Sequence, residues 1–349
     1  MSVVRDAVTA LWADPGAHPV MRALLTPASW LYAAGEGLAA AAWSSGLRRV
    51  HAPMLPTVSV GNLTVGGTGK TPVSSWLAGW FLARGARPAI VLRGYGNDEP
   101  EVHRQLQPDA VVVASPERVA GVREAAARGA TVAVLDDGFQ HRALARDVDL
   151  VLVSVERLLR ERDGHGQWRP QLLPAGPYRE PVARLRRAHA VLLTSKTADA
   201  HDRAIAHAAV AAVAPECPRV AIALEPGPLV SIAGTAAAAA VLAPGVRVLA
   251  IAGIGAPDLF ARQLETTGAT VTLRAFADHH AFSDRDVAAL ARESAAHALV
   301  VCTLKDAVKL APRWPREARA LSYLSQQCVL TEGRERLEAL LAPLVAFRP

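Results

Sequence analysis

The stretch with the clearest chemical meaning is Thr64-Val-Gly-Gly-Thr-Gly-Lys-Thr71. A glycine-rich turn lets backbone N–H groups close around phosphate oxygens, and a helix that begins there adds partial positive charge. In such a loop the lysine reaches the β- and γ-phosphates and the next hydroxyl holds Mg²⁺. The pattern predicts a nucleotide-binding loop, with Thr64 where glycine is usual. Its residues are Thr64, Val65, Gly66, Gly67, Thr68, Gly69, Lys70 and Thr71.

A carboxylate that could act on the same Mg²⁺ follows an apolar run in Thr131-Val-Ala-Val-Leu-Asp136-Asp137. If this run is a buried strand, Asp136 lies at its carboxyl end, where doubly wound sheets bind ligands. Aspartate is a suitable oxygen ligand for Mg²⁺, directly or through water. An ordinary strand followed by an Asp-Gly turn is the alternative interpretation.

The nucleotide is predicted to be ATP. Guanine-specific loop proteins carry Asn-Lys-x-Asp after a late strand, whereas here Thr194-Ser-Lys-Thr-Ala-Asp199 has its aspartate one residue too far along. Gly253-Ile-Gly255 lacks the third glycine of a dinucleotide loop and is typical of a tight turn. The sequence has no His/Glu or Cys/His spacing suited to zinc and no Gly-x-Ser-x-Gly elbow.

The elements around the loop predict a doubly wound α/β domain. Short runs rich in valine and leucine are typical of strands buried on both faces of a parallel sheet. A helix is expected from about Thr71 to Arg84, with an apolar stripe at helical spacing, and a second from Ser115-Pro116 to Arg128-Gly129. The expected strands are Thr57–Val60, Ala89–Leu92, Ala110–Ala114, Thr131–Leu135, Leu150–Val153 and Ala190–Thr194.

Four prolines within Pro215–Pro228 indicate a domain boundary. Beyond them, Val246–Ala252, Thr270–Arg274 and Leu299–Thr303 predict strands of a second, smaller α/β domain. The expected organisation is an N-terminal helical segment (1–50), a loop-containing kinase domain (51–222), the smaller domain (223–330) and a C-terminal helix (331–349) that returns to the first domain.

The N-terminal segment is apolar and contains one charge, Glu36, between Thr26 and Leu47. Its length could span a bilayer, but glycine, serine and alanine dilute it. Tryptophan and tyrosine with flanking arginines are typical of a helix seated at a headgroup boundary. Peripheral attachment is therefore the favoured prediction. A docked core helix and a true span are the alternatives.

Composition limits the class of protein. Of 349 residues, 51% are hydrophobic and 20% charged, which excludes disordered and collagen-like chains. Lys and Arg number 38 against 32 Asp and Glu, a net charge of +6 that suits an anionic partner without identifying it. Three scattered cysteines argue against a disulfide framework and for a reducing cytoplasm.

An ordered set of motifs resembles the tetraacyldisaccharide 4'-kinase family of lipid A biosynthesis over essentially the whole chain. The motifs are Gly61–Pro72, Arg93-Gly-Tyr-Gly96, Asp98-Glu-Pro100, Asp136-Asp-Gly-Phe-Gln-His141, Leu173–Glu180, Phe276-Ala-Asp-His279 and Lys305-Asp-Ala-Val-Lys309. The resemblance implies a P-loop nucleotide hydrolase-like sheet, a smaller α/β domain and a membrane-associating N-terminal helix. It further implies ATP- and Mg²⁺-dependent phosphorylation of the 4'-hydroxyl of a lipid A disaccharide 1-phosphate. The implied location is the cytoplasmic face of the bacterial inner membrane, with neither nucleic acid nor an obligate protein partner.

The resemblance also implies roles for individual residues. Lys70 and Thr71 would bind ATP·Mg²⁺, with Asp136 and Asp137 near the metal. Asp98 would be the general base, paired with His279 of the smaller domain when the two domains close. Further residues that would line the site are Asn62, Tyr95, Glu99, Arg118, Gln140, Arg179 and Glu180. Two positions depart from the family pattern, because the spacer before Asp98 is short and Leu304 replaces an acidic residue.

A different class of function is also compatible with the loop. A P-loop nucleotide-switch protein would act on a protein partner and have no small-molecule acceptor. A purely structural membrane protein would leave the Lys70-Thr71 pair unexplained. The N-terminal segment and the missing guanine motif favour the kinase.

Overall fold

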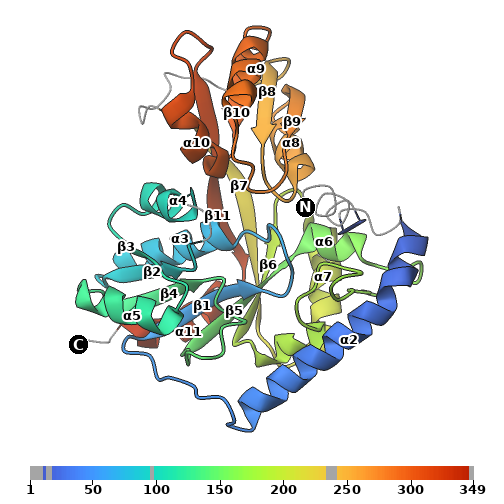
Figure 1. The fold of residues 1–349 in the computed structure, drawn as a ribbon, viewed down its shortest axis with the longest axis vertical. Helices are drawn as coiled ribbons and strands as arrows, with labels where there is room; N and C mark the ends of the chain where they lie inside the picture. The colour runs from blue at the N-terminus through green and yellow to red at the C-terminus, as the bar shows by residue number, and fades with distance from the viewer. Residues whose placement is uncertain (1–10, 13–17, 95–97, 233–241, 346–349) are drawn as a thin grey trace. The chain divides into compact units, whose positions relative to one another are not determined.

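The computed structural model describes residues 11–12, 18–94, 98–232 and 242–345. They form two compact units (Figure 1). Unit 1 comprises Met1–Gly94, Leu106–Ala223 and Val329–Pro349. Unit 2 comprises Tyr95–Gln105 and Leu224–Cys328. The chain therefore enters unit 2 twice, and the short first visit carries Asp98 and Glu99.

Unit 1 is built on a parallel sheet in the order β3-β2-β4-β1-β5-β6-β7. Strands β1, β2, β4 and β6 are buried along their whole length, as their continuous apolar sequences predicted. The strands are β1 (Thr57–Asn62), β2 (Pro88–Leu92), β3 (Val111–Ala114), β4 (Val132–Asp136), β5 (Val148–Ser154), β6 (Ala190–Ser195) and the first part of β7 (Arg219–Ser231), whose residues from Leu224 on belong to unit 2.

Helices cover this sheet. Helix α3 packs against β1, β2 and β4, α5 against β2, β3 and β4, and α7 against β6. The apolar stripe predicted for the first helix is realised, since Val73, Leu77 and Phe81 are fully buried. The unit 1 helices are α2 (Pro19–Ser44), α3 (Lys70–Leu82), α5 (Arg118–Ala127), α6 (Val155–Arg160), the 3₁₀ helix η1 (Val182–Arg187), α7 (Ala200–Val213) and α11 (Arg334–Val345).

Unit 2 has a smaller parallel sheet in the order β11-β10-β8-β9. Side chains of β8, α9, β10 and α10 form one of its core clusters around Leu249, Phe282 and Val300. Its elements are α4 (Asp98–Leu106), β8 (Arg247–Ala252), α8 (Pro257–Glu265), β9 (Thr270–Ala275), α9 (Asp284–Ser294), β10 (Leu299–Cys302), α10 (Leu304–Leu310), the 3₁₀ helix η2 (Ala311–Arg313) and β11 (Leu321–Glu332). The α/β fold class predicted from the sequence is confirmed.

Two strands were missing from the sequence prediction, and the start of one helix was placed too early. The missed strands are β7, which contains Pro226 and Pro228, and β11. Residues 225–231 of β7 are exposed or half-buried, so this half of the strand lacks the apolar run of a buried strand. Helix α5 begins at Arg118, because Glu117 rather than Ser115 occupies the extended position before its first turn.

The three cysteines are free thiols. Cys217 and Cys302 are buried and Cys328 is half-buried. Burial raises the pKa of all three, that of Cys328 to about 12. Each is therefore protonated and weakly nucleophilic at neutral pH.

Candidate functional site

The predicted phosphate loop joins the end of β1 to the start of α3. Gly66 and Gly69 have φ of 99° and 88°, values that glycine adopts without strain. Gly69 is the residue before the first turn of α3, so the loop delivers the unsatisfied N–H groups of that helix toward its concave side. Lys70 and Thr71 follow as the first residues of the helix. This is the geometry that binds a phosphate at a helix N-terminus.

Hydrogen bonds from buried polar side chains fix the conformation of the phosphate loop. The Asn62 amide nitrogen donates to Thr68 Oγ1 at 2.8 Å and approaches Gly66 O at 3.4 Å. Thr194 Oγ1, at the end of β6, donates to Thr68 O at 2.9 Å. Val65 N donates to Pro177 O at 2.8 Å. Asn62 was expected to line the site, whereas the contact from Thr194 was not foreseen.

Asp137 is the ion-pair centre beside the loop. Its oxygens accept from the Arg179 guanidinium at 2.9 and 3.1 Å, and Lys70 Nζ lies 3.6 Å from Oδ1. Burial raises the pKa of this carboxyl, but Lys70 and Arg179 outweigh it and leave the pKa well below its usual range. The residue also has φ of 55°, which is uncommon outside glycine. The ion pair with Asp137 fixes the Lys70 ammonium group beside the phosphate loop.

Arg179 and Gln140 connect Asp137 to the base of the loop. Arg179 donates to Asn62 Oδ1 at 2.5 Å, and its backbone N donates to Leu63 O at 2.7 Å. Gln140 Nε2 donates to Asn62 O at 2.7 Å. Both residues were expected to line the site. The structure places both in contact with Asn62, which in turn contacts Thr68 of the loop.

Asp136 and Thr71 are two of the oxygen groups that were predicted to hold a cation. Asp136 ends β4 and pairs in register with Val60 of β1, so it lies at the same carboxyl edge as the loop. Thr71, in the first turn of α3, and Asp136 are both largely buried. Within the described residues no cluster of three or more His, Cys, Asp or Glu side chains could hold a metal alone. A Mg²⁺ there would need phosphate or water oxygens as well.

Arg118 and Glu180 are buried charges near this edge. The Arg118 guanidinium donates to Ser115 O at 2.8 Å and to Asp136 O at 3.3 Å, which ties the start of α5 to the end of β4. The Glu180 carboxylate lies 3.5 Å from Arg187 and 3.6 Å from Arg142. Burial raises the pKa of Glu180 despite these arginines.

Unit 2 contains the predicted acid–base pair. Asp98 begins α4 and is 7% exposed, with Oδ2 3.5 Å from His279 Nδ1 and 3.2 Å from Lys309 Nζ. Burial raises the Asp98 pKa, but the neighbouring His279 imidazole and Lys309 ammonium groups together bring it well below the usual range. The Asp98 carboxylate in turn raises the pKa of His279 against the effect of burial. The predicted contact is confirmed.

One expectation about this pair is wrong. It was expected to form only on closure of two domains, yet Asp98 and His279 belong to the same unit and are paired there. His279 has φ of 62°, a left-handed conformation that aims its ring from a tight turn. Tyr95, also predicted to line the site, lies outside the described residues.

Two lysines of α10 were named in a motif but given no role. Lys309 contacts Asp98, and Lys305 Nζ pairs with Glu99 Oε1 at 3.1 Å. They stand one helical turn apart, so they present their charges to the same side. Asp306 beneath them is fully buried and accepts from Gly253 N at 2.9 Å. The spacing Lys-x-x-x-Lys was the sequence signal that could have identified Lys309.

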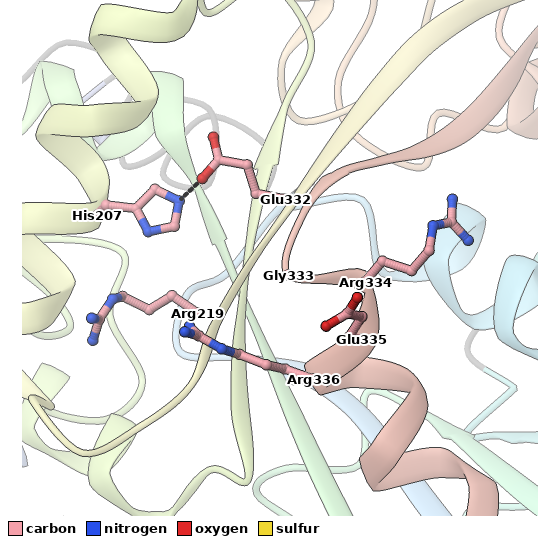
Figure 2. A pocket seen from close by; sticks show the side chains of 7 residues that line it. All are labelled: His207, Arg219, Glu332, Gly333, Arg334, Glu335 and Arg336. Carbon is pink, nitrogen blue, oxygen red and sulfur yellow. Dashed lines mark ion pairs between the residues drawn. The ribbon is translucent and has the colours of Figure 1, made fainter.

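A pocket of about 550 Å³ lies elsewhere in unit 1 (Figure 2). It contains the His207–Glu332 ion pair at 3.2 Å and three arginines at the start of β7 and α11. Arg219 is the first residue of β7, so this pocket lies at the amino edge of the parallel sheet, opposite the phosphate loop. It contributes none of the residues described above. Its lining is His207, Arg219, Glu332, Gly333, Arg334, Glu335 and Arg336.

Comparison with known proteins identifies the family. The model of the LpxK family, described as tetraacyldisaccharide-1-P 4'-kinase, matches residues 21–110 and 98–345. The chain belongs to this family. It is 36% identical to a tetraacyldisaccharide 4'-kinase of Anaeromyxobacter sp. (strain Fw109-5), over 98% of this chain and 97% of that protein. It is 34% identical to the enzyme of the same name from Chlorobaculum parvum, over 91% and 93%.

A solved LpxK structure shares the fold. LpxK from Aquifex aeolicus, crystallised with ATP, is 26% identical and superposes with a TM-score of 0.70 over 93% of this chain and 100% of that one. The chain is thus a kinase of lipid A biosynthesis, which favours the enzyme over the nucleotide-switch alternative.

The Asp98–His279 pair predicts a pH-dependent stability. The pKa of His279 is raised in the folded protein, so the protonated imidazole stabilises the fold. This contribution to stability is complete below the ordinary pKa of 6.5 and is lost as the pH rises through the raised value. His279→Asn, which tolerates the left-handed conformation, should lower the thermal midpoint more at about pH 5.5 than at about pH 8.5.

His207 is the matched control. Burial lowers its pKa in the folded protein although Glu332 opposes this, so His207→Asn should show the reverse trend with pH. A midpoint difference for His279→Asn that is the same at both pH values would contradict the pairing.

Proposed function

We propose that this LpxK-family kinase transfers the γ-phosphate of ATP to the 4'-hydroxyl of a tetraacyldisaccharide 1-phosphate, with Mg²⁺, at the cytoplasmic face of the inner membrane. The observation that carries the proposal is the phosphate loop with Lys70 held by Asp137 and Asp137 held by Arg179. That arrangement keeps a cation where charge accumulates on a transferred phosphoryl group. The acceptor follows from the names of the relatives.

The donor set supports Mg²⁺ rather than a softer metal, because hydroxyl, carboxylate and phosphate oxygens are hard ligands. Thr71 and Asp136 would hold the ion. Asp137 is less suited to the ion because Lys70 and Arg179 already occupy its oxygens. When bound, Mg²⁺ would neutralise phosphate charge.

Asp98 is the proposed general base. A sugar hydroxyl is a poor nucleophile at neutral pH, so a carboxylate must accept its proton as the bond to phosphorus forms. Asp98 is ionised at neutral pH, so its carboxylate has a free lone pair that can accept a proton. His279 would orient this carboxylate, and Lys309 would keep it charged.

Helix α2 supports a peripheral membrane location. Val20, Leu24, Leu31 and Leu38 recur on one side of the helix and, with Trp30, are 69–78% exposed. A contiguous exposed apolar face of this kind suits a lipid boundary. None of the helices in the described ranges is long and apolar enough to cross a membrane.

Transfer of label from γ-labelled ATP into extracted lipid tests the proposed reaction. The wild-type protein with Mg²⁺ should label a tetraacyldisaccharide 1-phosphate, and Lys70→Ala should nearly abolish labelling because a fixed cation at the phosphoryl group is lost. The variant should still fold and unfold cooperatively, since Lys70 is not part of the core. Wild-type ATP turnover without labelled lipid would contradict the acceptor.

If Asp98 is the base and His279 orients it, the losses in kcat caused by substituting each residue should not be additive. Asp98→Ala should lower kcat by about 10²- to 10⁴-fold, the usual worth of a general base. His279→Ala should cost less, and the double variant should be little worse than Asp98→Ala because the two residues act together. ATP affinity should persist in all three. Losses that multiply would instead assign independent roles to the two residues.

Charge on the outer face of α2 should release the protein from membranes. The triple variant Leu24→Glu, Leu31→Glu, Leu38→Glu replaces apolar contacts with repulsion from anionic lipid, so vesicle flotation should show its loss from the bound fraction. The control variant Ala288→Glu, Ala289→Glu, Ala342→Glu adds the same charge at exposed helical positions elsewhere and should still float with vesicles. Full retention of the α2 variant would exclude this face as the lipid contact.

A further inference from the structure

Helix α2 has a second face, opposite the exposed apolar one. Ser29, Tyr32, Glu36 and Ala40 follow one another at three- and four-residue steps, so they share one side of the helix. Ser29 and Ala40 are buried. Ser29, Tyr32 and Glu36 contact residues 172–184, the segment that leads from the cis Leu173-Pro174 bond through Arg179 and Glu180 to η1. Figure 1 shows α2 as the long blue helix of unit 1.

Hydrogen bonds fix the first part of that segment to α2. Ser29 Oγ donates to Leu172 O at 3.0 Å and accepts from Ala175 N at 3.1 Å. Tyr32 Oη donates to the backbone oxygen of Arg179 at 2.9 Å. These bonds hold main-chain atoms, so they set the path of the backbone from which the Arg179 side chain projects.

Ion pairs fix the second part. The Glu36 carboxylate pairs with Arg184 at 2.9 Å and with Arg142 at 3.5 Å. Arg142 lies 3.6 Å from Glu180, which also contacts Arg187 at 3.5 Å. Glu36 is 14% exposed and Glu180 4% exposed in their side chains, so these charges are poorly screened by solvent. The network links α2 to the residue that follows Arg179.

Arg179 carries this connection to the nucleotide loop. It holds both oxygens of Asp137 and the side-chain oxygen of Asn62, while Asp137 holds Lys70 and Asn62 holds Thr68. A continuous path therefore leads from Tyr32 to Lys70. Tyr32 contacts the backbone of Arg179, the Arg179 side chain contacts Asp137, and Asp137 contacts Lys70. A shift of residues 172–184 would therefore move the partners of the loop directly.

We infer that the docked face of α2 belongs to the scaffold of the ATP site, with Tyr32 and Glu36 as positioning residues that act through Arg179. The inference rests on the proposed function in one respect, that the loop binds ATP. It assigns α2 a task at the nucleotide site in addition to any contact of its outer face with lipid. Neither residue touches the loop itself, so their effect must pass through the segment between them.

ATP affinity of the full-length protein in detergent tests this inference. Tyr32→Phe removes one hydroxyl and Glu36→Gln one charge, and neither changes the outer face of α2. In calorimetry with MgATP, each variant should bind more weakly and the double variant roughly 2- to 30-fold more weakly, the range for coupling through residues that contact no ligand. In the kinetic assay KM for ATP should rise while KM for the lipid acceptor stays the same.

Thr26→Val is the matched control, because Thr26 Oγ1 donates to Arg22 O within its own helix. It should leave ATP affinity unchanged. Unchanged affinity in the double variant, or an equal loss in Thr26→Val, would overturn the inference. If the double variant does not fold, Tyr32→Phe decides the question alone. Failure of the wild-type protein to bind ATP would instead overturn the proposed function.

Discussion

A single guanidinium group, that of Arg179, carries the organisation of unit 1 around the phosphate loop. Four oxygens surround it, both carboxylate oxygens of Asp137 and the side-chain and backbone oxygens of Asn62. A partly buried charge is costly unless it is paired and hydrogen-bonded, so these partners must keep their relative positions. The end of β1, the turn after β4 and the segment before η1 are thereby held at one point. The left-handed conformation of Asp137 is compatible with the fold because two cations fix its carboxylate.

Much of the nucleotide site could be predicted because its signals are local. The loop, its lysine and its threonine lie within eight consecutive residues. The strand before them is a short run typical of a fully buried strand, and the helix after them has an apolar stripe of period 3.6. Asp136 was predictable because a carboxylate that follows a buried parallel strand lies at a known edge of the sheet. Seven motifs in order then indicated the family, although the P-loop alone indicates only a fold.

Other parts depend on contacts between distant residues, which leave no periodic signal. Glu99 and Lys305 are 206 positions apart in sequence, and Lys309 reaches Asp98 across a similar separation. In isolation, Asp98 is compatible with a solvated turn, and only α10 and His279 make it a buried charge. Strand β11 was missed because most of it is half-exposed and polar residues interrupt its apolar ones. Strand β7 begins with an apolar run at 220–224, but its second half is exposed or half-buried and contains two prolines. The roles of the site residues and the expected domain limits stay predictions.

The burial of the three thiols has a practical consequence for following α2. Cys217, Cys302 and Cys328 are protonated and at least half-buried, so maleimide reagents should react slowly with all of them in the folded protein. The natural cysteines should therefore contribute little background labelling. A lone cysteine introduced on the outer face of α2 would be the one fast-reacting position among the described residues, and a fluorophore or spin label there would report whether that face enters lipid.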